Sequence, residues 1–212
     1  PLLFISKINN VATNYINGTY QETKSLIWKD GLTNIGRFLL ARLFYVDGLV
    51  IITTTIGIFG TSVMGLPLHQ ILFLGLLANI SGALGCYLFG FLIKNDKFTI
   101  ILTLIILILL ILAISVNTDQ IIFMILVIIA TFFTGPLQSS SRVVMANLTD
   151  DNKQGFSFGI FTLSGKITAF LGPICAALLT FLISQRIGFA FSIILLSLGL
   201  FLMINVSYNK KN

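Results

Sequence analysis

Charged residues are scarce in this chain: only 9% of its 212 residues are Asp, Glu, Lys or Arg, whereas a soluble domain carries about 25%. Histidine occurs once and cysteine twice, which is too few for a zinc site, a disulfide framework or a Ser-His-Asp site. A membrane enzyme would need a cluster of such groups, and the chain offers only the adjacent acids Asp150 and Asp151. We therefore expect neither a water-soluble fold nor an enzyme, and no metal ion or cofactor.

Apolar residues make up 56% of the chain and raise its mean hydropathy to +1.00. A helix that spans lipid needs roughly 20 apolar residues, and the chain contains six runs of that length. The sequence therefore predicts an all-α membrane protein with six transmembrane helices, at about residues 37–62, 68–93, 98–116, 120–144, 156–183 and 187–206. Residues 1–36 are predicted to form a cytoplasmic linker with interfacial helices around Trp28, and residues 207–212 a cytoplasmic tail.

Lysine and arginine lie almost entirely on one side of these spans. The other side holds Arg186 alone. The first side holds ten such residues, namely Lys7, Lys24, Lys29, Arg37, Lys94, Lys97, Arg142, Lys153, Lys210 and Lys211. Cytoplasmic loops of membrane proteins collect these residues, so both termini are predicted to be cytoplasmic. The net charge of +6 then reflects topology rather than nucleic-acid binding, and the expected partner is the lipid bilayer. The frequent Ile, Asn and Lys residues favour a bacterial plasma membrane.

The six spans fall into two similar groups of three. The first span of each group carries polar or charged residues, the second is rich in small residues, and the third is almost purely apolar. An odd number of spans in each group gives the two copies opposite topology, and such inverted repeats build many secondary transporters. We therefore expect the first span of each group to face a cavity and the third to face lipid.

Two charged residues, Asp47 and Lys166, lie deep in the predicted spans. Each stands about ten residues, or about 15 Å, from the cytoplasmic start of its span. A charge at the centre of the hydrocarbon costs about 2.5–3.5 kcal/mol on insertion scales, so such a residue is a functional candidate. The equal depth allows an ion pair, which either contacts substrate and switches between states or permanently locks two helices together. Asp47 is the only acid at this depth, which favours the proton as the driving ion.

Further polar residues lie nearer the cytoplasmic ends of the spans. Arg42 stands about 6 Å into its span, where its long stem can extend to the interface. Gly135, Gln138 and Arg142 fall on one helical face, and Pro136 allows a kink beside them. Either Arg42, Gln138 and Arg142 form a cytoplasmic gate, or the two arginines are ordinary positive-inside anchors.

Three motifs, Ala41–Gly48, Gly135–Met145 and Ser164–Pro173, together resemble the major facilitator superfamily. The similar branch contains the autophagy-related vacuolar amino-acid effluxers and their bacterial relatives. The resemblance covers residues 37–206 and implies helices seven to twelve of a twelve-helix transporter. The superfamily's usual motif between helices eight and nine is not reproduced, because the segment Gly90–Lys97 is shorter and lacks the arginine and second glycine.

The resemblance implies that the family's functional positions fall on Arg42, Asp47, Gln138, Arg142 and Lys166, and Tyr45 of the first motif is added as a substrate contact. The function expected is secondary active transport of a small solute, such as an amino acid or related metabolite, by alternating access. The chain begins with Pro1 rather than Met. We therefore expect a fragment whose partner is an N-terminal six-helix half, upstream or in a second chain. The alternative is a six-helix membrane scaffold or subunit that does not transport.

Overall fold

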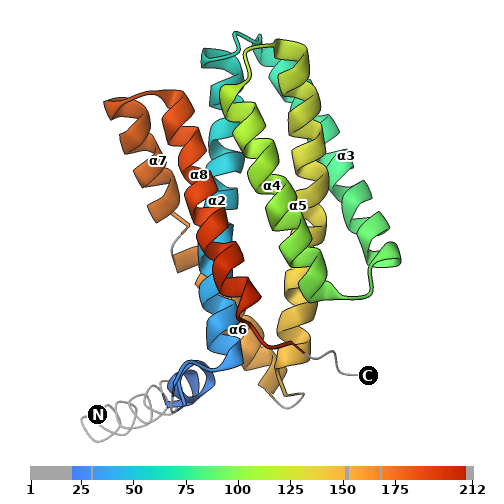
Figure 1. Cartoon of the computed structure of the whole chain (residues 1–212), viewed down its shortest axis with the longest axis vertical. Helices are drawn as coiled ribbons and strands as arrows, with labels where there is room; N and C mark the ends of the chain where they lie inside the picture. The colour runs from blue at the N-terminus through green and yellow to red at the C-terminus, as the bar shows by residue number, and fades with distance from the viewer. Residues whose placement is uncertain (1–20, 30, 151–152, 168, 209–212) are drawn as a thin grey trace, which may run out of the picture.

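The computed structural model describes residues 21–29, 31–150, 153–167 and 169–208, and it is helical almost throughout. After a short helical segment at residues 21–27, the helices are α2 (Asn34–Ser62), α3 (Leu68–Leu92), α4 (Asp96–Val116), α5 (Gln120–Leu148), α6 (Gln154–Ile167), α7 (Leu171–Leu182) and α8 (Gln185–Ile204). They stand side by side in a bundle, and the start of α2 and the end of α8 lie at the same end of it (Figure 1). Six segments are long and apolar enough to cross a membrane, which confirms the predicted fold class.

α2, α4 and α8 begin two or three residues earlier than the hydropathy pattern predicted, because a polar residue caps each of these helices. The Thr33 hydroxyl accepts a hydrogen bond from the backbone N–H of Gly36 at 3.0 Å, so α2 starts at Asn34. Asn95 caps α4 and Ser184 caps α8 in the same way. A side-chain oxygen at this position satisfies a backbone N–H that has no partner within the helix. Capping residues are polar, and hydropathy alone therefore places such a boundary too late.

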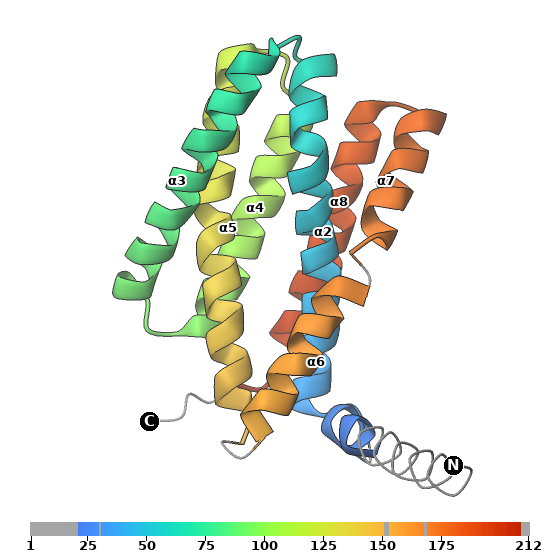
Figure 2. The ribbon, with the colours of Figure 1, turned by 180° about the vertical axis from the view of Figure 1, so that it is seen from behind.

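The fifth predicted span, at about 156–183, is one membrane-competent segment, Gln154–Leu182, and it consists of two helices. α6 ends at Ile167 and α7 begins at Leu171, end to end along the bundle (Figure 2). Gly172-Pro173, a pair of residues that often bends a helix, lies just after the observed break. Pro173 is the third residue of α7, where a backbone N–H has no partner within the helix and its absence is tolerated. The proline thus begins the second helix rather than bending a continuous one.

Each helix of the first group of three packs on the other group in the same way as the corresponding helix of the second group. α2 packs on α8 and α5 packs on α4, so the first helix of each group lies against the third helix of the other. Likewise α3 packs on α5, while α6 and α7 pack on α2. The two third helices, α4 and α8, contact each other. α2 and α5 run in opposite directions (Figure 1), which is the arrangement expected of inverted repeats.

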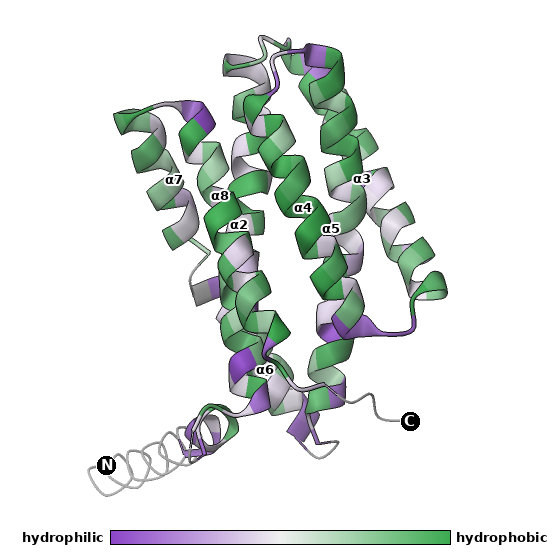
Figure 3. Cartoon of the chain, viewed as in Figure 1, coloured by the Kyte–Doolittle hydropathy of each residue, from purple (hydrophilic) through white to green (hydrophobic). Residues whose placement is uncertain are grey.

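Apolar residues run along the length of the helices, and hydrophilic ones gather at the ends of the bundle (Figure 3). α4 shows how the third helix of a group divides its surface. One side is exposed and apolar, and the opposite side is fully buried against α5 and α8; the exposed residues include Ile105, Leu109 and Leu112, and the buried ones Leu104, Leu107 and Ile111. The expectation that the third helix faces lipid therefore describes only one side of α4.

A cation at the start of each third helix also caps the C-terminal end of the other third helix. Arg186, the second residue of α8, donates two hydrogen bonds of 2.7 Å from Nη1 to the carbonyls of Ser115 and Asn117 at the end of α4. Lys97, the second residue of α4, donates from Nζ to the carbonyls of Ile204 and Val206 at the end of α8, at 3.0 and 2.6 Å. A cation there satisfies free carbonyls and complements the helix dipole. Arg186, which the sequence predicts as the lone cation on the non-cytoplasmic side, thus has a structural role.

Beside Lys97, the end of the chain is attached to α4 and α5 through Tyr208. Its hydroxyl accepts a hydrogen bond of 2.8 Å from the Asn147 side-chain amide and donates one of 3.3 Å to Asp96. Burial raises the pKa of Tyr208, which keeps this hydroxyl protonated and able to donate.

We expect Arg186→Gln to lower the thermal stability of the bundle, because it removes two charge-assisted hydrogen bonds to otherwise free carbonyls. The expected loss is about 2 kcal/mol, which corresponds to roughly 4–8 °C in a chain of this size. The melting temperature of the purified protein in detergent measures it. Arg37→Gln is the control, since Arg37 is exposed on the first turn of α2. Equal melting temperatures for the two variants would contradict the capping role.

Close contact between α3 and α5 depends on glycine. A Cβ atom at Gly85 would overlap the carbonyl oxygen of Phe132, and one at Gly135 would overlap the carbonyl oxygen of Gly82. Small residues on α3 therefore serve helix packing, as small residues at helix contacts in lipid commonly do. Gly135 thus faces α3, whereas its spacing predicted that it shares one helical face with Gln138 and Arg142.

Candidate functional site

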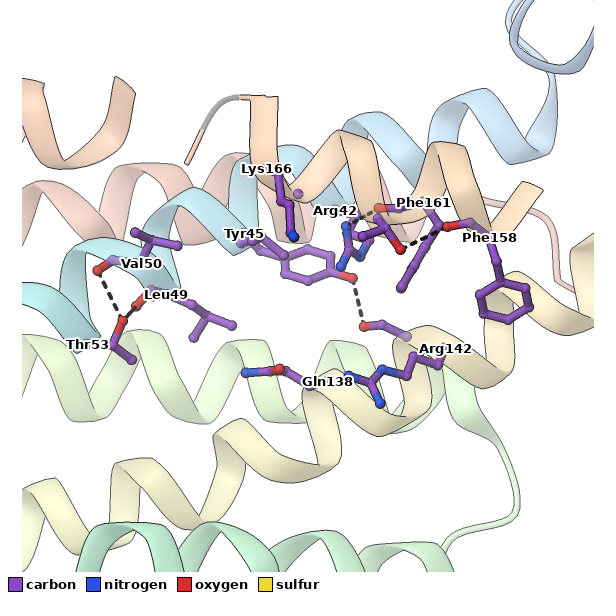
Figure 4. Close-up of a pocket in the computed structure, with 14 residues that line it drawn as sticks. Arg42, Tyr45, Leu49, Val50, Thr53, Gln138, Arg142, Phe158, Phe161 and Lys166 are labelled. Atoms are coloured by element: carbon purple, nitrogen blue, oxygen red, sulfur yellow. Dashed lines mark hydrogen bonds between the residues drawn. The ribbon is translucent and has the colours of Figure 1, made fainter. Parts of the chain in front are cut away.

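A cavity of about 540 Å³ lies between α2, α5 and α6 (Figure 4). Cavities of roughly 300–1,000 Å³ suit small-molecule ligands. Its lining mixes polar and charged side chains with apolar ones: Arg42, Tyr45, Val46, Leu49, Val50, Thr53, Gln138, Ser141, Arg142, Phe158, Phe161, Thr162, Gly165 and Lys166. A second groove, of about 700 Å³, lies between residues 23–43 and α6, but among the described residues that line it only Thr23 and Ser164 have polar side chains. The first cavity is therefore the candidate site.

Arg42 crosses from α2 to α6 and is held there by three contacts. Its Nη1 donates hydrogen bonds to the Phe161 carbonyl at 2.7 Å and to the Ser164 hydroxyl at 3.2 Å, and its guanidinium lies 3.6 Å from the centre of the Phe161 ring. A Cβ atom at Gly165 would stand 2.6 Å from Nη1, so the glycine leaves room for the guanidinium. The expectation that Arg42 extends to the interface is wrong, because two hydrogen-bond acceptors and an aromatic ring within the bundle hold the side chain more favourably.

Tyr45 joins α2 to α5 across the back of the cavity. Its hydroxyl lies 2.7 Å from the Ser141 hydroxyl, and the Ser141 hydroxyl also lies 2.5 Å from the Leu137 carbonyl. A carbonyl only accepts, so the Ser141 proton goes to Leu137 and the Tyr45 hydroxyl must donate to Ser141. Tyr45 is 1% exposed, and Gly199 of α8 packs directly against it from behind. Its ring is therefore fixed in place at the cavity wall.

Gln138 and Arg142 lie one turn apart on α5, and Lys166 approaches from the end of α6 (Figure 4). All three side chains are exposed and line the cavity. Lys166 is twelve residues into α6, which places it about 18 Å from the start of that helix. The structure thus brings together five predicted site residues from three helices: Arg42, Tyr45, Gln138, Arg142 and Lys166.

Asp47, the sixth predicted site residue, is absent from the lining of this cavity. It is 5% exposed and lies in the part of α2 that packs against α7 and α8. Its neighbour Gly48 lies against Leu196, and a Cβ atom at Gly172 would stand 3.1 Å from the Asp47 carbonyl oxygen. Asp47 is thirteen residues into α2, or about 20 Å, which agrees with the predicted equal depth of Asp47 and Lys166. An ion pair between the two stays a prediction.

The family described as "Vacuole effluxer Atg22 like" matches residues 8–212, which is nearly the whole chain. The chain belongs to this Atg22-like family. No curated protein matches it. The family resemblance inferred from the three motifs is confirmed, and the match begins earlier than the predicted first span, within the predicted linker. Membership in a family of effluxers, together with six membrane-competent segments, makes this Atg22-like chain a multi-pass membrane transport protein.

The Atg22-like site also contains residues that the sequence did not single out, four of them on α6. Phe158, Phe161, Thr162 and Gly165 line the cavity together with the predicted Lys166. Their spacing of three, four, seven and eight positions is that of one helical face. The signal was therefore present beside Lys166, but aromatic residues in an apolar run are common in any membrane helix and did not stand out.

The arrangement can bind and orient a solute but offers little for covalent chemistry. No group of three or more His, Cys, Asp or Glu residues in the described ranges is placed to hold a metal ion. Cys86 and Cys175 are free thiols. The charged and hydroxyl groups of the cavity supply hydrogen-bond donors, and its apolar side chains supply contact area.

Proposed function

We propose that this chain is the C-terminal half of a twelve-helix secondary transporter that moves a small solute by alternating access. An amino acid or a related metabolite is the class of solute suggested by the family. Both termini lie in the cytoplasm, and the membrane is a bacterial plasma membrane. Arg42, Gln138 and Arg142 serve as the cytoplasmic gate. Tyr45, Lys166 and Asp47 bind the substrate and couple its transport to protons.

The observation that carries this proposal is that one cavity lies between the first helices of the two inverted repeats, α2 and α5. Secondary transporters place their substrate sites where such repeats meet. The cavity has intramembrane cations on its wall, and such residues usually mark a substrate or ion pathway. An N-terminal six-helix half completes the cavity from the opposite side, and rocking of one half against the other exposes it alternately to the two faces of the membrane.

Alternating access predicts that a cysteine in the cavity reacts with a membrane-impermeant maleimide from both sides of the membrane. We propose Gln138→Cys for this test, because the Gln138 side chain is exposed in the cavity wall. The background carries Cys86→Ala and Cys175→Ala, since both natural cysteines are free thiols. Labelling is measured in right-side-out and inside-out vesicles, and both are expected to react. The test needs no knowledge of the substrate.

The matched control is Phe201→Cys on α8, at a position that is 66% exposed on the apolar outside of the bundle. A thiol facing lipid stays protonated and is not expected to react in either type of vesicle. Reaction of the cysteine at position 138 from one side only would refute alternating access and favour the non-transporting scaffold.

A further inference from the structure

The described residues that line the cavity between α2, α5 and α6 carry charge of one sign, which is positive. Arg42, Arg142 and Lys166 bring three positive charges to it from three helices, and none of the described residues that line it is Asp or Glu. Arg142 lies close enough to act electrostatically on Arg42. Repulsion between like charges is stronger where protein and lipid keep the dielectric constant low. A negatively charged ligand would relieve this repulsion, whereas a positively charged one would increase it.

Arg42 supplies a fixed charge. The Phe161 carbonyl, the Ser164 hydroxyl and the Phe161 ring hold its guanidinium against α6. These contacts take up Nη1 and one face of the guanidinium plane, and they leave the positive charge beside the cavity. A charged group whose position is set before the ligand arrives loses little conformational entropy on binding.

Arg142 and Lys166 supply the groups that can reach a ligand directly. Both side chains are exposed, and they enter the cavity from α5 and α6 respectively (Figure 4). A guanidinium binds two oxygens of a carboxylate or phosphate at once, and an ammonium binds such a group as a point charge. Two cations on different walls of one cavity can therefore both attract an oxyanion that binds in it.

The neutral groups of the cavity limit what else it can bind. The Tyr45 hydroxyl already donates to Ser141, so it retains only its acceptor capacity. Gln138 and Thr162 offer neutral polar contacts, and Leu49 and Val50 an apolar surface. This lining suits a small organic skeleton that carries a negatively charged group, within a volume of about 540 Å³.

We infer that the solute bound in this cavity carries a compact oxyanion, a carboxylate or a phosphate, that Arg142 and Lys166 contact and that the fixed charge of Arg42 attracts. This inference rests on the proposed transport function and names the substrate class of the same site. It excludes cationic solutes and ranks uncharged ones below anionic ones.

Calorimetric titration of the native transporter in detergent tests the inference, with succinate, inorganic phosphate and uncharged glycerol as probes. We expect succinate or phosphate to bind and glycerol not to bind. Binding of succinate alone assigns a carboxylate, and binding of phosphate alone assigns a phosphate. Lys166→Gln and Arg142→Gln are each expected to weaken binding of the oxyanion by about 10- to 100-fold. Lys166→Arg should retain binding within a few fold, because it keeps the positive charge.

The matched control is Lys153→Gln, which removes an exposed lysine just before α6 and outside the cavity, and which should leave the affinity unchanged. The inference is overturned if neither oxyanion binds more tightly than glycerol, or if Lys166→Gln and Arg142→Gln bind the oxyanion as the native protein does. Two-sided labelling of a cysteine at position 138 tests alternating access without any ligand. A protein that labels from both sides but binds no oxyanion therefore disproves the substrate class alone.

Discussion

Replacing Gly85 with leucine is expected to prevent α3 and α5 from packing together and to leave little folded protein in detergent extracts. A Cβ atom at this position would overlap the Phe132 carbonyl oxygen and would stand 2.8 Å from the carbonyl carbon. The obstacle is backbone rather than a movable side chain, so the two helices must separate. Overpacking of ordinary cores costs about 1–3 kcal/mol, and a contact with backbone exceeds that range. Even 2 kcal/mol changes the ratio of folded to unfolded protein about 30-fold.

The same contact explains why glycine stands opposite this particular carbonyl. The N–H that would bond to Phe132 in a regular helix belongs to residue 136, which is proline and has no N–H. The carbonyl oxygen is therefore without its helical donor, and the Gly85 backbone approaches it directly. Hydrogens on an α-carbon form weak hydrogen bonds with such oxygens at helix contacts. Pro136 on α5 and Gly85 on α3 thus act together, because the proline frees the Phe132 carbonyl and the glycine lets α3 approach it.

Gly75→Leu on the same helix is the control, because nothing lies within 4 Å of a Cβ atom at Gly75. The two variants change helix propensity and hydropathy equally, so they differ only in what the new side chain meets. The measurement is the yield of monodisperse protein in size-exclusion chromatography, with Gly75→Leu expected near the native level. Equal yields from the two variants would show that α3 and α5 do not pack as described.

The membrane fold follows from the sequence because the hydrophobic effect acts on every residue of a span. Runs such as Ile100–Ile114 and Ile187–Val206 are almost purely apolar, and in lipid a helix satisfies the backbone of such an unbroken run. The division into two groups of three also follows, because each group repeats the same order of polar, small and apolar spans. The position of the break between α6 and α7 was not predicted, since the hydropathy averaged over a span does not show where a helix is interrupted.

The candidate site was predicted only in part. Arg42, Gln138, Arg142 and Lys166 stood out because charged and polar residues are rare in spans, and the structure brings them to one cavity. Their partners could not be inferred, since the Phe161 carbonyl that holds Arg42 is a backbone group without any sequence signal. Depth alone suggested that Asp47 faces Lys166. Depth gives no information on the rotation of a helix about its axis, and Asp47 lies outside the cavity that Lys166 lines.

We expect Asp47→Asn to abolish proton-driven transport. Asp47 is an acid 5% exposed within a span, and asparagine has nearly its shape but no proton to exchange. The measurement is uptake into proteoliposomes of whichever oxyanion binds in calorimetry, with and without an imposed pH gradient. The expected loss of gradient-driven accumulation is about 100-fold or more, since one coupling group carries the proton. Exchange of labelled for unlabelled solute, which needs no net proton movement, should persist.

Persistence of exchange separates coupling from folding, because a misfolded transporter loses both activities. Asp47→Glu keeps an ionisable carboxyl group and should retain part of the gradient-driven uptake. Asp150→Asn removes an exposed acid after the end of α5 and should have no effect. If Asp47→Asn accumulates solute at the native rate under a pH gradient, Asp47 is not the coupling acid. Asp47 is buried where α2 packs against α7 and α8, and it would then serve to hold these helices together. The sequence likewise allowed a purely structural role, in which Asp47 permanently locks two helices together.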